Sequence, residues 1–471
     1  MSAAIARPPG RRSCSAPNAD HTASSSGRST WHETTAYRSG VVGGIAQRIP
    51  RGAVLLVVAA SAVPRLLALA IERDQILESY VEKSDTFART LVESGTFGFL
   101  PGVPSAYTQP LYAWFLAGLY WPLDRSWVVV GVAQILVAVA TALLVLVIGT
   151  RLASARTGVL AALVATLHPY LVWHDVHVNR EILDGLLAAA IVLLALVAYE
   201  LRSPPYALAL GAVSGLAILS NARLLLLPLV LAPYAAWRIR PAGRAVVAAV
   251  LVVAGAALVT APWVVRNQVV IGCATITTDT RALWKANNPA TYDVLARGGW
   301  IDDVPDLPGV PPWPEKAAGI SVAAAKAVDE CAQASFYRDE VFDFWRDHPG
   351  EKARLAVQAV GMLWSPFLSV TADDAGQQGA SDLAQRTVEP AFVLLLYAFA
   401  LWGAFLAPRR FVALAALLLG LNTLTAMVFA GTVRYRAPWD FVLALLAAFA
   451  LERAWALLRR RRSPAAASAV P

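Results

Sequence analysis

One short segment of the sequence carries the first candidate chemistry. Residues 72–110 directly follow an apolar stretch, and their acidic side chains include Asp74, Glu78, Glu82, Asp85 and Glu93. A carboxylate held at a membrane surface can accept a proton from a hydroxyl group that reacts there. We predict that Asp85 is such a catalytic base. The competing interpretation is that Asp85 caps a short helix, because acidic residues favour helix N-termini.

The other acids of this segment have a simpler interpretation. Asp74, Glu78 and Glu82 recur every four residues, which is the spacing of one face of a helix. We therefore expect these three carboxylates to lie on a solvated helix face.

Further ionisable residues lie near the ends of the remaining apolar stretches rather than in their middles. They are His174, Asp175, His177, Arg180 and Glu181, then Arg223, then Arg266 beside Asn267, and finally Arg434 and Arg436 on either side of Tyr435. A transporter needs polar groups near the bilayer midplane, where charge is costly and therefore usually functional. The observed distribution instead predicts a site at one face of the membrane.

Each of these groups also has a structural interpretation. His174 and His177 with Asp175 have the spacing of a metal cluster, but histidines at a span end also serve as amphipathic anchors. Glu181 either functions in a site or caps the helix that it begins.

The arginines near the C-terminus allow two interpretations as well. Arg434 and Arg436 either take part in chemistry or anchor lipid headgroups. Arg223 either snorkels toward the interface or supplies a cation to a pocket.

The elements that position these residues are membrane helices. Hydrophobic residues make up 57% of the 471 residues, and runs of about 20 apolar residues recur along the chain. Such runs must be helical in lipid, because only helices and closed barrels satisfy their own backbone there. The predicted class is an all-α polytopic membrane protein with about ten spans, at 52–71, 126–150, 157–173, 181–200, 206–221, 223–237, 245–265, 388–407, 411–430 and 438–457.

The positions of basic residues predict the topology of these spans. Arginine-rich loops fall on one side, which the positive-inside rule assigns to the cytoplasm. Residues 1–50 then form a disordered cytoplasmic tail without a cleaved signal peptide, 51–458 a transmembrane domain, and 459–471 a second cytoplasmic tail. The loops 72–125 and 266–387 fall outside. Residues 110–122 form an interfacial helix, and 351–368 either lies on the membrane or crosses it.

Net charge and cysteines exclude some classes. The net charge of +8 comes from arginines in tails and short loops, without the basic, aromatic-interleaved face of a nucleic-acid-binding protein. Three cysteines are too few for a disulfide framework. Cys273 and Cys331 share one predicted outer loop, where they form either a disulfide or two free thiols.

Five segments, spread over most of residues 55–450, occur in an informative order. They are SDTFARTLVESGTF with QPLYAWFLAGLY, HPYLVWHDVHVNREILDGLL, GLAILSNARLLLLP, APWVVRNQVVIG with LWKANNPATY, and GTVRYRAPW. In this order they resemble the GT-C superfamily of integral membrane glycosyltransferases, and within it the protein O-mannosyltransferase and aminoarabinose transferase branch. Many relatives carry two adjacent acids in the first loop, whereas Asp85 is followed by Thr86. The second acidic role would then be absent or supplied by Glu181.

The resemblance implies a GT-C-type bundle with extracytoplasmic juxtamembrane helices. It implies transfer of a sugar from a polyprenyl-phosphate donor to a hydroxyl of a cell-envelope acceptor, at the extracytoplasmic face of the plasma or inner membrane. No cofactor is implied with certainty, and a divalent metal is an open expectation. With Asp85 as the base, the expected substrate-binding residues are Gln109, Glu181, Arg223, Arg266, Asn267, Lys285, Arg434, Tyr435 and Arg436. The alternatives are a transporter or flippase of lipid-linked sugars and an envelope polymerase or ligase that uses a diphosphate-linked donor.

Overall fold

The computed structural model describes residues 49–79, 81–367 and 387–462, and within these ranges the regular elements are helices. Residues 1–48 and 463–471 hold nearly all of the two predicted tails and lie outside the described residues. The all-α class predicted from the sequence is confirmed.

Six helices are long and apolar enough to cross a membrane. They are α2 (Arg51–Glu72), α5 (Trp127–Leu152), α8 (Glu181–Leu201), α11 (Ala242–Val270), α20 (Arg409–Val428) and the segment Val433–Arg459, which includes most of α22 (Asp440–Arg462). Four shorter apolar helical segments accompany them, namely α6 (Ala155–Thr166), α9 (Pro204–Ser220), Ala222–Ala236, which includes α10 (Leu227–Ala236), and α19 (Glu389–Ala404). Each predicted span therefore corresponds to one of these segments.

The third predicted span, 157–173, is wrong as one continuous helix. Helix α6 ends at Thr166, and a separate short helix α7 (Pro169–His174) follows. The break precedes Pro169, which cannot donate a backbone hydrogen bond and disfavours helical geometry at His168. The chain is thereby redirected just before the polar segment 174–180.

Small residues set how closely the helices of the bundle pack. A Cβ atom added to Gly211 of α9 would lie 2.1 Å from the carbonyl oxygen of Val252 of α11. A Cβ added to Gly255 of α11 would lie 2.5 Å from the carbonyl oxygen of Leu208. Such close backbone contact is typical of helix pairs in membranes. Lipid provides no hydrophobic driving force for helix association, so the helices associate through close packing at small residues. Side chains such as Ile71 and Leu258, which are 78% and 71% exposed, suit a lipid-facing surface.

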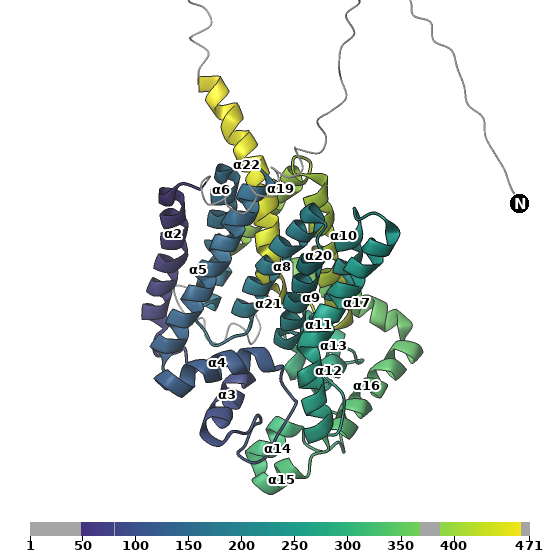
Figure 1. The fold of residues 1–471 in the computed structure, drawn as a ribbon. Helices are drawn as coiled ribbons and strands as arrows, with labels where there is room; N and C mark the ends of the chain where they lie inside the picture. The colour runs from purple at the N-terminus through teal and green to yellow at the C-terminus, as the bar shows by residue number, and fades with distance from the viewer. Residues whose placement is uncertain (1–48, 80, 368–386, 463–471) are drawn as a thin grey trace, which may run out of the picture. The chain divides into compact units, whose positions relative to one another are not determined.

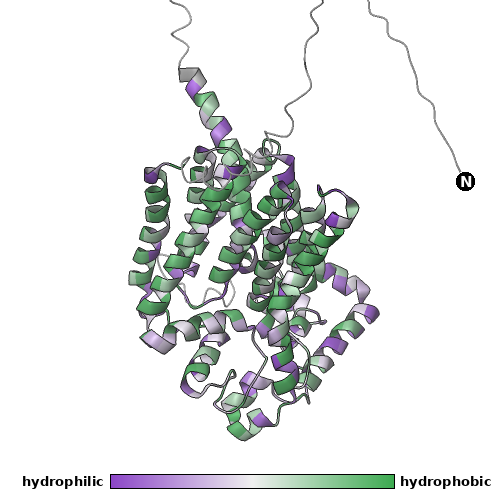
Figure 2. Ribbon diagram, viewed as in Figure 1, coloured by the Kyte–Doolittle hydropathy of each residue, from purple (hydrophilic) through white to green (hydrophobic). Residues whose placement is uncertain are grey.

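A layer of shorter helices covers one end of the bundle (Figure 1). It contains α3 (Lys83–Ser94), α4 (Pro110–Leu123), α12 (Arg281–Lys285), α13 (Thr291–Ala296), α14 (Pro314–Ile320), α15 (Val322–Lys326) and α16 (Glu330–Asp347). Figure 2 shows that hydrophobic residues dominate the bundle, whereas this layer mixes hydrophilic and hydrophobic residues. Helix α4 closely matches the interfacial helix predicted at 110–122.

The long segment between α11 and α19 is anchored at two places. A disulfide joins Cys273 to Cys331, so the bridge and not the pair of free thiols is present. Helix α17 (Pro349–Trp364) packs against α20, and a Cβ on Gly431 would overlap the carbonyl oxygen of Ala359 in α17. Helix α17 is shorter than the six helices that could cross a membrane.

Candidate active site

Four charged side chains from three distant segments meet at the end of the bundle that carries the helical layer. Glu82 precedes α3, Arg180 and Glu181 stand at the start of α8, and Arg434 lies on the short helix α21 (Val433–Arg436). The Glu82 Oε1 atom lies 3.4 Å from Arg180 Nη1 and 3.6 Å from Arg434 Nη2. Two carboxylates and two guanidinium groups thus form one cluster, which we call the charged cluster.

Glu181 and Arg434 form the closest pair of the charged cluster. Arg434 donates from Nε to Glu181 Oε1 at 2.6 Å and from Nη2 to Oε2 at 3.2 Å, and the Glu181 side chain is only 3% exposed. Thr432 caps α21, since its hydroxyl accepts a hydrogen bond from the backbone N–H of Arg434. The bidentate geometry fixes the plane of the guanidinium group.

Arg180 connects the cluster to the first loop. Its Nη1 donates to Gln109 Oε1 at 2.7 Å, immediately before α4. The Arg180 Nε atom is buried and has no hydrogen-bond acceptor within the described part of the chain. One strong donor of the charged cluster is therefore unused.

Glu82 has the matching unused acceptor. Its backbone N–H donates to the carbonyl of Val178, which fixes it beside the start of α8. Its Oε2 atom is buried and accepts no hydrogen bond from the described residues. Burial raises the pKa of this carboxyl above its usual value, although Arg180 and Arg434 oppose the shift. The prediction that Glu82 lies on a solvated face is wrong, because its neighbours come from α8 and α21 and are invisible to local spacing.

The segment 174–180 that carries Arg180 is held by buried polar contacts. Gln134 of α5 donates from Nε2 to the carbonyls of Asp175 and His177, each at 2.8 Å, and accepts from Tyr112 at 2.6 Å. Asn179 donates to the carbonyls of His174 and His177. These bonds satisfy backbone groups that no helix satisfies, and so they fix the path of the chain into α8.

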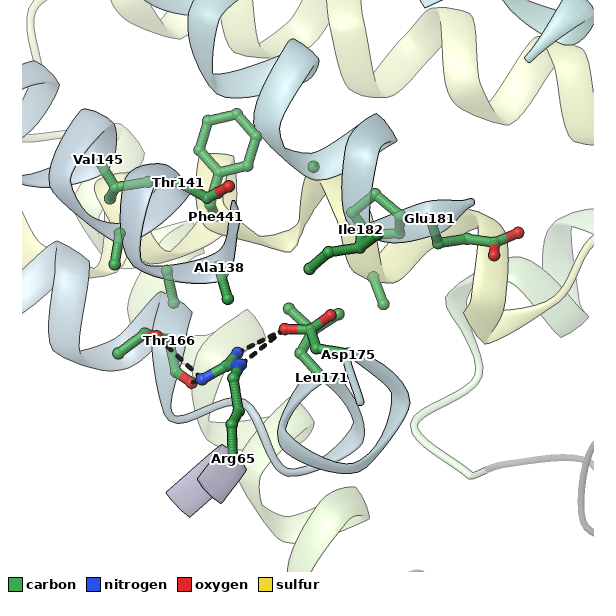
Figure 3. Close-up of a pocket in the computed structure, with 15 residues that line it drawn as sticks. Arg65, Ala138, Thr141, Val145, Thr166, Leu171, Asp175, Glu181, Ile182 and Phe441 are labelled. Atoms are coloured by element: carbon green, nitrogen blue, oxygen red, sulfur yellow. Dashed lines mark hydrogen bonds and ion pairs between the residues drawn. The ribbon is translucent and has the colours of Figure 1, made fainter. Parts of the chain in front are cut away.

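An ion pair inside the bundle holds the same segment from the other side. Arg65, in the middle of α2, contacts Asp175 Oδ2 at 2.7 Å and donates to the carbonyl of Thr166 at 2.9 Å. The two residues line a mostly apolar cavity of about 40 Å³, and Figure 3 shows the Glu181 carboxylate pointing away from it. A charge at this depth is costly unless paired, which the contacts achieve.

Asp85 lies one helical turn from Glu82 and has different partners. Its Oδ1 accepts from the Tyr120 hydroxyl at 2.6 Å, and Arg125 Nε lies 3.0 and 3.1 Å from its two oxygens. Its side chain is 3% exposed. Both oxygens are therefore engaged in joining α3 to the end of α4. The predicted role of Asp85 as the base is not tested by these contacts and stays a prediction.

A second polar group lies deeper in the bundle. Asp184, one turn after Glu181, accepts from Ser220 at 2.7 Å and from Asn221 at 3.0 Å. Arg223 stacks on the ring of Tyr435 with its guanidinium carbon 3.6 Å from the ring centre, and it donates to the carbonyl of Ala430. These five residues are not all joined by contacts, but Asp184, Asn221, Arg223 and Tyr435 line one small cavity.

The remaining predicted residues lie in separate clusters. Arg436 is fully buried and contacts Asp440 at 3.1 Å and the carbonyl of Ser365 at 2.7 Å, so it links α17 to α22. Arg266 donates to the carbonyl of Ser105 and to Asn267, and it stacks on Trp263. The structure does not join them to Arg434.

Lys285 belongs to the helical layer. It donates to the carbonyl of Asp302 and lies 3.3 Å from Asp306, which also pairs with Arg281. Of the predicted set, Glu181 and Arg434 thus belong to the charged cluster, and Gln109 contacts it through Arg180.

The donor set does not fit a divalent cation. Among the described residues, no group of three or more His, Cys, Asp or Glu side chains is arranged to hold a metal. Asp175 is paired with Arg65, and Glu181 with Arg434, so their oxygens face guanidinium groups rather than a common centre. Metal dependence stays an untested expectation.

A model of the dolichyl-phosphate-mannose-protein mannosyltransferase family matches residues 104–265. The predicted resemblance to protein mannosyltransferases is thus confirmed over this part of the chain. The matched part of the chain holds Gln109, Arg180 and Glu181, whereas Glu82 and Arg434 lie outside it. No curated protein sequence matches the chain.

Solved structures that match the chain at low identity include an archaeal oligosaccharyltransferase and ArnT. The archaeal oligosaccharyltransferase AglB from Archaeoglobus fulgidus, in complex with an inhibitory peptide and a dolichol-phosphate, shares 14% identity at a TM-score of 0.49. The match covers 87% of this chain and 51% of that chain, so this chain spans about half the length of AglB. ArnT from Cupriavidus metallidurans, bound to undecaprenyl phosphate, shares 15% identity at a TM-score of 0.41, with 85% and 78% covered.

Proposed function

We propose that the chain transfers a sugar from a polyprenyl-phosphate carrier to a hydroxyl group of a cell-envelope acceptor, at the extracytoplasmic face of the membrane. The observation that carries the proposal is the unused carboxylate oxygen of Glu82, buried against Arg180 and Arg434 at the end of the bundle. The family model supports the class of reaction, since its members are named for a lipid-phosphate-linked sugar donor.

In this proposal Glu82 is the general base. Its free Oε2 accepts the proton of the acceptor hydroxyl while that oxygen attacks the anomeric carbon of the donor. The bond from this carbon to the phosphate oxygen breaks, and the electron pair leaves with the phosphate. A positioned base typically contributes ~10²–10⁴-fold in rate. The pKa of Glu82, which burial raises, brings its basicity closer to that required near neutral pH.

Arg180 and Arg434 would receive the departing phosphate. The free Nε of Arg180 provides one donor before any rearrangement. Arg434 is held in plane by Glu181, so its remaining N–H groups keep a fixed direction. Fixed positive charge at a developing anion lowers the barrier by ~3 kcal/mol per donor in comparable sites.

Asp85 acts on the same site indirectly in this assignment. Its two donors, the Tyr120 hydroxyl and Arg125 Nε, leave it poorly placed to accept another proton, but they fix the start of α3. The backbone N–H of Asp85 donates to the carbonyl of Glu82 at 2.9 Å. Asp85 would therefore position Glu82 rather than touch the acceptor.

The proposal is tested with the purified protein in lipid nanodiscs. Polyprenyl monophosphate and polyprenyl diphosphate carriers bearing the same hexose or pentose are supplied separately, together with envelope glycan and glycoprotein fractions. We expect mass spectrometry to show loss of the monophosphate donor, release of polyprenyl phosphate and a glycosylated acceptor. Use of the diphosphate donor alone, or movement of the intact donor across a liposome membrane without cleavage, would overturn the proposal.

A further inference from the structure

A cavity of about 360 Å³ lies in the helical layer, apart from the charged cluster. Residues of the first loop, the end of α11 and the helices α14 to α16 line this open cavity, and they include Leu100, Ser105, Ile271, Pro314, Lys326 and Glu330. This volume is in the range of small-molecule sites, which is ~300–1,000 Å³. The disulfide between Cys273 and Cys331 ties together two parts of the lining, because Cys331 follows Glu330 and Cys273 lies two residues after Ile271.

Glu330 supplies a buried carboxylate to the lining of this cavity. It is 9% exposed, and its Oε2 accepts from the backbone of Ala106 at 3.0 Å and from the Thr278 hydroxyl at 2.7 Å. Within the described residues, no hydrogen-bond donor contacts its other oxygen, Oε1. A carboxylate that is nine-tenths buried and half satisfied offers a strong acceptor to a ligand inside the cavity.

The first loop connects this cavity to the charged cluster. Ser105 lines the cavity, and Gln109, four residues later, accepts from Arg180. Two threonines hold the intervening residues, since Thr277 donates to the carbonyl of Tyr107 and the N–H of Thr278 donates to the carbonyl of Ala106. On the opposite wall, Pro314 precedes Glu315, which pairs with Lys83 at 3.2 Å, next to Glu82.

We propose that this cavity binds a neutral glycan, the hydroxyl-rich acceptor of the reaction. The lining offers acceptors for hydroxyl protons at Glu330 and Asp329, with Lys326 as an opposing charge. It also offers the apolar surfaces of Leu100, Ile271 and Pro314, against which the C–H face of a sugar ring packs. As an acceptor site the cavity rests on the proposed function, but glycan binding can be measured without any transfer.

The test uses the full chain in detergent with neutral tri- to pentasaccharides of glucose, mannose and N-acetylglucosamine as probes. Saturation-transfer NMR measures binding to the unaltered protein and to two matched variants. Ala325→Trp places an indole in the lining, whereas Ala323→Trp changes an exposed residue of the same helix that does not line the cavity. Thr278→Val is a further control. It removes the hydrogen bond from the Thr278 hydroxyl to Glu330 Oε2 but does not alter Glu330 Oε1, the oxygen offered to the glycan.

We expect at least one oligosaccharide to bind, with a dissociation constant about tenfold higher in Ala325→Trp and within about twofold of the unaltered protein in Ala323→Trp. Glu82→Gln, which tests the proposed function, should leave glycan binding unchanged. Binding of no oligosaccharide, equal binding by both tryptophan variants, or exclusive binding of a neutral Ser/Thr peptide would overturn the inference. Glycan binding without any sugar transfer would instead leave it standing and refute the proposed function.

Discussion

Arg434 holds both carboxylate oxygens of Glu181, at 2.6 and 3.2 Å, although 253 residues separate the two in the sequence. The pair joins the start of a long membrane helix to a short turn near the end of the chain. It also brings a guanidinium group within 3.6 Å of Glu82. This relationship is the core of the proposed site.

The first prediction concerns the guanidinium group of Arg434, which donates to both carboxylate oxygens of Glu181. Lysine at this position keeps the positive charge but cannot contact both oxygens of Glu181. We expect Arg434→Lys to lower kcat about 10²-fold, because the phosphate loses an oriented donor. The control is Arg338→Lys, at an exposed arginine that pairs with its neighbour Asp339. A variant that transfers sugar at the normal rate would show that charge alone suffices.

The pH dependence of transfer reports on Glu82. Its pKa is raised from 4.5 by burial, and a base works only when deprotonated. Activity should therefore be full well above this raised pKa and should fall as the pH is lowered through it. A pH–rate profile of kcat/KM on the unaltered protein measures the midpoint. A profile that stays flat down to pH 4.5 contradicts a base with a raised pKa.

Asp85 and Arg125 allow a structural role to be separated from a catalytic one. Asp85→Asn should destabilise the protein by about 2 kcal/mol, because it leaves Arg125 without its counter-charge. In Asp85→Asn with Arg125→Met, no unpaired charge remains, so thermal unfolding should return toward that of the unaltered protein. We expect transfer to return with it. A double variant that is stable but inactive would identify Asp85 as the base after all.

Gln134 should control the mobility of segment 174–180. Leucine in its place leaves the buried carbonyl of Asp175 without its donor, at a cost of about 1–3 kcal/mol, and leaves the carbonyl of His177 with Asn179 as its donor. Hydrogen exchange measured by mass spectrometry should show faster exchange in peptides covering 174–180. Gln268→Leu, at an exposed position near the end of α11, serves as the control. Unchanged exchange in this segment would show that the hydrogen bonds from Gln134 do not hold it in place.

Lys352 predicts a second pH effect, on stability. Its amine donates to Asn287, at 2.5 Å, and to the carbonyl of Met427, at 2.6 Å, and burial lowers its pKa to about 8. The unfolded chain holds this proton up to a higher pH, near the ordinary value of 10.5, so the unfolded state binds more protons between these values. Stability should therefore rise with pH from about 8 to 10.5, relative to Lys352→Met. The prediction is wrong if the free energies of unfolding of the two proteins change in parallel over this pH range.

The spans could be predicted because each is determined by its own composition. A run of about 20 apolar residues has one stable form in lipid, whatever surrounds it. The break before Pro169 was missed because apolarity continues through it, although the proline itself was a signal.

The site could be predicted only in part. Glu181 and Arg434 stood out as charges at helix ends, and Gln109 through the resemblance. Glu82 did not, because its burial comes from residues about 100 and 350 positions away. Arg436 resembled Arg434 in the sequence, yet a two-residue step turns it by about 200° around a helix toward Asp440. Only tertiary contacts distinguish the two.

Single-turnover transfer by Glu82→Gln tests the central claim most directly. Polyprenyl monophosphate sugar is bound to the purified variant, donor binding is measured separately, and acceptor is then added. The account predicts donor affinity within about threefold of the unaltered protein and a transfer rate lower by at least about 10²-fold. Normal transfer by this variant, with donor bound equally well, would contradict it.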